Sequence, residues 1–314
     1  MTRFLLRRTA GFVATLFVVS LVVFAVMNVL PGDPAITILG IEATEEALAA
    51  LRAQLGLNDP LHVRYLSWIG GALRGDFGIS HSFRVPVAGL IAERLPLTIA
   101  LAVAGTAVTL AVALAAGIAA ASRQGRAGDW AVMVASQVGI AVPAFWLAML
   151  LVLLFAVYLR WLPPGGFPGW SDPVAAARSL ILPVTALALV QASVLARVTR
   201  SSALEVMRLD FVRTARASGF SRGRVLWRHV LPNALIPIVT IVGLQFANVV
   251  TGTIVIENVF FLPGLGRLVF QSIANRDLPT VQALVLMFAA IVVTVNFLVD
   301  IAYHLIDPRL KDRA

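Results

Sequence analysis

The length of its uninterrupted apolar stretches constrains this chain most. Six stretches approach or exceed the roughly 20 residues that a helix needs to cross a hydrocarbon core of about 30 Å. They run over residues 9–30, 96–121, 131–159, 179–197, 234–256 and 280–304. Since lipid offers no partner to the backbone, such stretches fold as helices. We therefore predict an all-α membrane protein with six transmembrane helices, of which the fourth is the shortest.

Composition agrees with a lipid environment. Hydrophobic residues make up 59% of the chain and charged residues 13%, against about 45–50% and about 25% in soluble domains. No cysteine is present, which excludes disulfides and thiolate metal sites. The first apolar run is too long for a signal peptide, and no small-x-small cleavage site follows it. We interpret it as a retained first span.

Basic residues alternate along the chain in a way that predicts its orientation. The N-terminus, the loop near residues 123–126, the segment 197–228 and the tail 309–313 hold 16 of the 25 basic residues. With Asp129, Asp300 and Asp307 at their edges included, they hold 6 of the 16 acidic ones. Because Lys and Arg are retained on the cytoplasmic side of short loops, these segments and both termini are expected in the cytoplasm. The same distribution makes lipid headgroups, and not nucleic acid, the expected anionic contact.

The segment between the first and second spans is too long for a simple connector. Thr44 is positioned to cap a helix that ends at Gly56, and Asp59 and Pro60 begin a second helix with Leu61, Tyr65, Trp68 and Ile69 on one side. We predict a small helical extracytoplasmic insertion. Two roles stay open for it: a lid on the span ends, or a docking surface for an outside partner.

Motifs for chemistry are weak or absent. A P-loop needs a lysine after its glycines, and Lys311 is the only lysine, in an unrelated context. Gly219–Gly223 fits the G-x-S-x-G pattern, but no strand is expected before it, so Ser221 is better explained as a helix N-cap. The four histidines are scattered without metal-ligand spacing. We predict no catalytic residue and no metal site.

Polar residues within the fifth span form one stripe. Gln245, Asn248 and Gly252 stand at i, i+3 and i+7, so they share a helix face. Polar groups in lipid must face protein or water. The stripe indicates either the lining of a translocation pathway or hydrogen bonding and close packing against a neighbouring helix.

The segment from Arg197 to Pro232 carries eight arginines. Leu204, Met207, Phe211 and Ala215 recur at helical spacing before Gly219, and Val225, Leu226 and Val230 recur after it. We expect two short amphipathic helices joined at the glycine. They could lie on anionic lipid or dock a cytoplasmic protein.

The spacing inside this segment resembles the EAA loop of ABC importer permeases, whose pattern is E-A-A-x-x-x-G followed after nine residues by I-x-L-P. Four residues match the pattern: Ala215, Gly219, Leu231 and Pro232. Three replace the family's Glu, Ala and Ile: Arg213, Thr214 and His229. The departures, with Arg216 in the middle, resemble the T-A-R-A-x-G variant of the dipeptide, oligopeptide and nickel branch.

Further segments extend this resemblance over nearly the whole chain. They are Leu55–Leu61, Gly75–Gly78, Glu257–Phe260, Pro263–Leu268 and Asp307–Arg309. The chain is thus similar to a B-type permease of that branch, with a type I ABC importer fold. The expected domains are a tail and first span at 1–30, an extracytoplasmic cap at 31–95, a five-span core at 96–304 with a coupling loop at 198–232, and a cytoplasmic tail at 305–314.

The resemblance also implies a function and partners. The chain would form half of the pore of a bacterial inner-membrane importer for small peptides, or for a related solute such as a nickel chelate or glutathione. Its implied partners are a second permease subunit, expected to be a paralogue, two cytoplasmic ATPase subunits and an extracytoplasmic substrate-binding protein. ATP and Mg would bind the ATPases, which leaves this chain without a cofactor. The alternative is an ATP-independent channel or secondary transporter.

Overall fold

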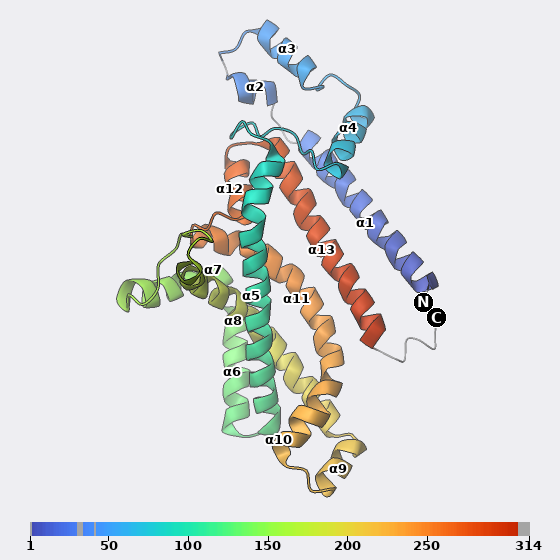
Figure 1. Ribbon diagram of the computed structural model, residues 1–314, viewed down its shortest axis with the longest axis vertical. Coiled ribbons are helices and arrows are strands. Elements are labelled where there is room, and N and C mark those ends of the chain that lie inside the picture. The colour runs from blue at the N-terminus through green and yellow to red at the C-terminus, as the bar shows by residue number, and fades with distance from the viewer. Residues whose placement is uncertain (1, 30–33, 41, 307–314) are drawn as a thin grey trace. The chain divides into compact units, whose positions relative to one another are not determined.

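The computed structural model describes residues 2–29, 34–40 and 42–306. Within them the regular secondary structure is helical apart from one isolated antiparallel bridge, Ile79 to Pro86, and turns and loops connect the helices (Figure 1). The α-helices are α1 (Thr2–Val29), α2 (Pro34–Leu39), α3 (Glu45–Gln54), α4 (Leu61–Leu73), α5 (Val87–Ser122), α6 (Ala127–Ala141), α7 (Ala144–Leu151), α8 (Pro173–Met207), α9 (Asp210–Ala217), α10 (Arg222–Val225), α11 (Leu231–Val259), α12 (Leu265–Ala274) and α13 (Leu278–Ile306). Two π-helical segments, η1 (Val152–Tyr158) and η2 (Leu226–Val230), continue α7 and α10. Residues 307–314 of the predicted tail, with its Asp307–Arg309 motif, lie outside the described residues.

The chain divides into two compact units. The core unit contains Thr98–Leu262 together with the end of α13, and the N-terminal unit contains Leu5–Leu97 with Pro263–Thr294. The boundary falls inside α5 and inside α13. Each unit is described below by itself.

The predicted spans are confirmed as helices. Among the described residues, α1, α5, α8, α11 and α13 are each long and apolar enough to cross a membrane. A sixth candidate consists of α6 followed by α7 and η1, which are bent by 105° at their junction. The part of the chain that the structure describes therefore has five continuous candidate spans, and six if the bent pair counts as one.

The third predicted span is the one that departs from a straight helix. The sequence predicts one transmembrane helix over 131–159, but the helix breaks at Pro143. Val142 is extended, with φ −85° and ψ 122°, because a proline ring disfavours helical geometry in the residue before it. Pro143 also lacks the N–H that would continue the ladder.

The fourth span is longer than the sequence indicates. The prediction of 179–197 gives the shortest span, whereas α8 has 35 residues. Asp172 caps its start by accepting hydrogen bonds from the backbone N–H groups of Val174 and Ala175, each at 3.0 Å. At its other end the helix continues through Arg197 and Arg200.

The N-terminal unit contains the two helices expected between the first spans. Thr44 Oγ1 accepts a hydrogen bond from the N–H of Ala47 at 3.3 Å, which confirms the predicted cap of α3. Tyr65 of α4 hydrogen-bonds Ser20 of α1 at 2.7 Å between hydroxyl oxygens. The predicted apolar face is wrong at Leu61, which is 59% exposed and lies one turn before this contact.

The core unit is built around small and aliphatic side chains. Its cluster of buried residues draws on α5, α8, α9, α10, η2 and α11. Leu195 and Ala203 of α8 belong to it, as do Val212 of α9, Val225 of α10 and Ile238 of α11. Small residues let helix backbones approach closely, and the resulting van der Waals packing stabilises helix association in a membrane. The arginine-rich loop is therefore fixed to the transmembrane helices by its own apolar residues.

Candidate functional site

The arginine-rich loop folds as a helical elbow at the cytoplasmic end predicted for α8 and α11 (Figure 1). Helix α9 ends in a Schellman motif. The Gly219 N–H donates to the Arg216 carbonyl at 3.1 Å, and the Phe220 N–H donates to the Ala215 carbonyl at 3.4 Å. Gly219 has φ +82°, where a side chain would cost about 1–2 kcal/mol. The expected pair of helices joined at this glycine is confirmed.

The second helix of the elbow begins with a capped turn. Ser221 Oγ accepts a hydrogen bond from the Arg224 N–H at 3.4 Å, as predicted. Because a helix and not a strand precedes Ser221, a nucleophile elbow is excluded. From Arg222 onward, α10, η2 and α11 follow one another without a loop, so the elbow is continuous with the fifth span.

The inner face of the elbow differs from the predicted apolar stripe at one position. Ala215 and Val212 are buried, whereas Phe211 is 42% exposed. The prediction treats residues 204–215 as one helix. The structure instead places an extended residue, Leu209, with φ −72° and ψ 148°, between α8 and α9. This residue resets the helical register and turns Val212 inward in place of Phe211.

The outer face of the elbow carries most of the residues proposed from the resemblance. Arg213, Thr214, Arg216 and Gly219 are exposed, while Ala215 anchors α9 to the core. Arg213 pairs with Asp210 at 3.3 Å, an exposed contact that is worth little. Six arginines of this segment are exposed around α9, α10 and η2: Arg208, Arg213, Arg216, Arg222, Arg224 and Arg228. The face is therefore strongly basic.

The last three proposed residues lie where the elbow joins α11. The half-buried His229 stacks on Phe220, with 5.6 Å between ring centroids, and links the two arms of the elbow. Leu231 begins α11 and Pro232 follows it, directly after the π-helical turn η2. These contacts give the spacing from Gly219 to Pro232 a structural role.

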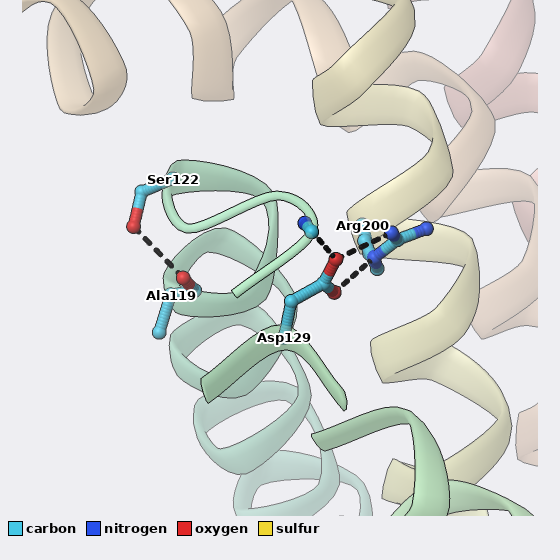
Figure 2. A network of polar contacts seen from close by, with 5 residues as sticks. Ala119, Ser122, Asp129 and Arg200 are labelled. Carbon is cyan, nitrogen blue, oxygen red and sulfur yellow. Dashed lines mark hydrogen bonds and ion pairs between the residues drawn. The ribbon is translucent and has the colours of Figure 1, made fainter. Parts of the chain in front are cut away.

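A partly buried ion pair, absent from the sequence prediction, joins α6 to α8 (Figure 2). Arg200 of α8 donates from Nε and from one terminal nitrogen to the two carboxylate oxygens of Asp129, at 2.5 and 2.7 Å. The N–H of Gly125 donates to the same carboxylate at 2.9 Å. Two opposite charges within apolar segments were the available signal, but 71 residues separate them.

The predicted polar stripe of α11 divides between two environments. Gln245 is buried and exchanges hydrogen bonds with Gln191 of α8, donating to its carbonyl at 3.1 Å and accepting at its own carbonyl at 3.4 Å. A Cβ on Gly252 would lie 3.1 Å from Leu187 of α8. Asn248 is exposed. Two of the three residues thus contribute to the packing of α11 on α8.

Comparison with known families identifies the class of protein. Residues 113–312 match the family of binding-protein-dependent transport system inner membrane components, and residues 1–102 match the N-terminal model of such membrane components. The chain belongs to this family, as a non-catalytic permease subunit of an ABC transporter in the inner membrane. That membership decides against an ATP-independent channel or secondary transporter.

Individual relatives are similar over their full length. The chain is 43% identical over 312 residues to a protein of Brucella abortus (strain 2308) named as a peptide transport system permease, with 99% of both chains covered. It is 42% identical over 311 residues to the glutathione transport system permease protein GsiC of Salmonella choleraesuis (strain SC-B67), again covering 99% of both.

Solved structures share the fold at low sequence identity. The methionine ABC transporter MetNI in an inward-facing conformation matches 69% of this chain and 96% of its own, with 17% identity and a TM-score of 0.55. An amino acid ABC transporter crystallised with histidines matches 69% and 94%, with 16% identity and a TM-score of 0.51. These matches confirm the predicted type of fold.

Proposed function

We propose that this chain forms half of the translocation pore of an importer for small peptides, and that a cytoplasmic ATPase docks on the α9–α10 elbow. The carrying observation is the construction of the elbow. Val212 and Ala215 fix its inner face in the core, while its outer face presents exposed arginines around Gly219. A rigid, basic projection attached to two spans is suited to transmit the movement of a partner.

The full assembly in this proposal has a second permease subunit, expected to be a paralogue, two ATPases that bind ATP and Mg, and an extracytoplasmic binding protein. Both termini and the elbow face the cytoplasm in this proposal, because basic residues gather in these segments of the sequence. Within the pore we assign Asn248 to the pathway surface, since it is exposed. Gln245 and Gly252 would act on the pathway through their contacts with α8.

Docking on the elbow is tested by reversing its charge and altering its turn. We expect the triple variant Arg213→Glu, Arg216→Glu and Gly219→Leu to lower ATPase co-purification and peptide uptake about tenfold or more, as loss of interface hot spots does. The matched control is Arg126→Glu, which reverses an exposed arginine outside the elbow. Undiminished uptake with normal ATPase assembly would refute the docking site.

Sidedness is tested with the same elbow. Since the sequence contains no cysteine, a single Ser218→Cys substitution creates a unique label site at an exposed position. A membrane-impermeant maleimide should label it only from the cytoplasmic side, and bound ATPase should protect it. Labelling of intact cells from outside would contradict the proposed orientation.

The substrate class is tested by transport. Proteoliposomes with the complete complex should accumulate labelled di- and tripeptides, including glutathione, only with ATP and the binding protein. This expectation rests on the names carried by the relatives. Uptake of a nickel chelate with no uptake of peptides would replace the proposed substrate and leave the docking site untouched.

A further inference from the structure

The ion pair between Asp129 and Arg200 joins parts of the core unit that are distant in sequence. Asp129 lies in the first turn of α6 and is 3% exposed. Its carboxylate accepts three hydrogen bonds, two from Arg200 and one from Gly125 (Figure 2). The contact therefore ties the turn between α5 and α6 to α8.

Arg200 is close to the elbow along α8. Seven residues separate it from the end of that helix at Met207, which is about two helical turns. One extended residue, Leu209, then leads into α9. A displacement of α9 thus reaches Arg200 through a short, regular helix.

Close packing continues the same connection further along α8. A Cβ on Gly117 of α5 would lie 2.5 Å from the Cβ of Thr199, and a Cβ on Gly139 of α6 would overlap the side chain of Ser193. Small residues let helix backbones approach closely in membranes. Helix α8 is therefore in direct contact with both α5 and α6 at positions that admit no larger residue.

A bidentate pair is a costly way to obtain stability alone. Removing two charges from water carries a penalty that their attraction often only balances, and neutral replacements of both partners are frequently tolerated. The two parallel hydrogen bonds from the Arg200 guanidinium to the Asp129 carboxylate do fix the relative orientation of the two side chains, since they constrain two donors and two acceptors at once. Such geometry serves positioning better than it serves stability.

We propose that Asp129 and Arg200 are positioning residues that lock the α5–α6 turn to α8, so that a movement of the elbow displaces α5, α6 and α8 together. The inference rests on the proposed docking of an ATPase on the elbow. It adds α5 and α6 to the helices that move when the elbow moves. The elbow itself is attached along the chain only to α8 and α11, the fourth and fifth spans. The ion pair would make α5 and α6, which belong to the second and third spans, follow that movement as well.

A double neutral variant tests this role apart from folding. Asp129→Asn combined with Arg200→Gln leaves no unpaired buried charge, so the protein should accumulate and bind the ATPases as the wild type does. We expect peptide uptake per hydrolysed ATP to fall about tenfold, within the usual range of coupling between sites. Arg200→Lys keeps the positive charge but not the two-pronged contact. Its peptide uptake per hydrolysed ATP should lie between that of the wild type and that of the double variant. Arg126→Gln, an exposed arginine next to the same turn, is the matched control.

The outcomes separate this inference from the docking proposal. Normal ATPase binding with wild-type uptake per ATP in the double variant overturns the positioning role alone. A wild-type chain that binds no ATPase overturns both proposals. If the double variant fails to accumulate, the pair is structural, and the positioning role is refuted unless Arg200→Lys accumulates normally with reduced uptake per ATP.

Discussion

Two buried aspartates, one in each unit, stand near the start of a helix but are held by different chemistry. Asp129 is paired with a guanidinium from another helix. Asp277, which is fully buried, accepts from three neutral donors instead. Ser80 donates its hydroxyl, His81 its backbone N–H at 3.1 Å, and Thr280 its hydroxyl at 2.9 Å.

The difference shows what each contact fixes. In the N-terminal unit, Asp277 precedes α13 and holds the loop that contains Ser80 and His81, and the positive end of a helix dipole favours its charge. In the core unit, Asp129 holds one long helix to another through a second charge. We therefore expect the core contact to depend on charge balance and the N-terminal contact to depend on hydrogen bonds.

The largest expected effect is the loss of the core carboxylate. Asp129→Ala leaves the Arg200 guanidinium unpaired, with its side chain only 23% exposed. Breaking a buried pair in this way costs about 3–5 kcal/mol, so the thermal midpoint in detergent should drop markedly. Asp59→Ala, which removes an exposed carboxylate, serves as the control. A drop no larger than that of the control would contradict the role of charge.

A smaller effect is expected from Asp277→Ala. The groups left behind are two hydroxyls and a backbone amide, and an unsatisfied neutral donor costs about 1–3 kcal/mol. Hydroxyls can also rotate toward other acceptors. Hydrogen exchange over residues 78–86 should rise in this variant, because the loop loses its anchor. If Asp277→Ala destabilises the protein as much as Asp129→Ala, the contrast between the two sites is wrong.

The sequence predicts the elements of this fold better than the contacts between them. Long apolar stretches identify the spans, because lipid leaves the backbone only one way to satisfy its hydrogen bonds. Local chemistry identifies the caps at Thr44 and Ser221 and the turn at Gly219, since each depends on residues within a few positions. The elbow is therefore predictable in outline.

The missed features depend on distant residues or on one local dihedral angle. No local sequence pattern indicates the pairing of Asp129 with Arg200, which are 71 residues apart. Without a known partner, an arginine indicates the end of a span. That reading makes the predicted fourth span too short. The extended residue Leu209 exchanges Phe211 for Val212 on the inner face of α9. The sequence predicts Gln245 on a polar stripe, but its hydrogen bonds with Gln191 of α8 decide which way it faces.

The smallest expected effect is a pH dependence confined to the N-terminal contact. Burial lowers the pKa of His81 below its ordinary value of 6.5, while the charge of Asp277 acts in the opposite direction. The unfolded state therefore binds more protons than the folded state as the pH falls through 6.5 and below, so stability decreases on acidification and is recovered as the pH rises. Because Asp277 opposes the effect of burial, the change should be modest.

Hydrogen exchange at about pH 8 and about pH 5.5, on either side of the histidine titration and corrected for intrinsic rates, measures this dependence. Residues 78–86 should lose protection at the lower pH, and His81→Asn should abolish most of the change. His62→Asn, at an exposed position of α4, should leave it intact. The turn at residues 123–129 should not respond, because its partners are an aspartate and an arginine, which do not titrate in that range. An equal loss of protection in both segments would show that acid acts on the whole fold. The proposed difference between the ion pair of Asp129 and the neutral hydrogen bonds of Asp277 would then be wrong.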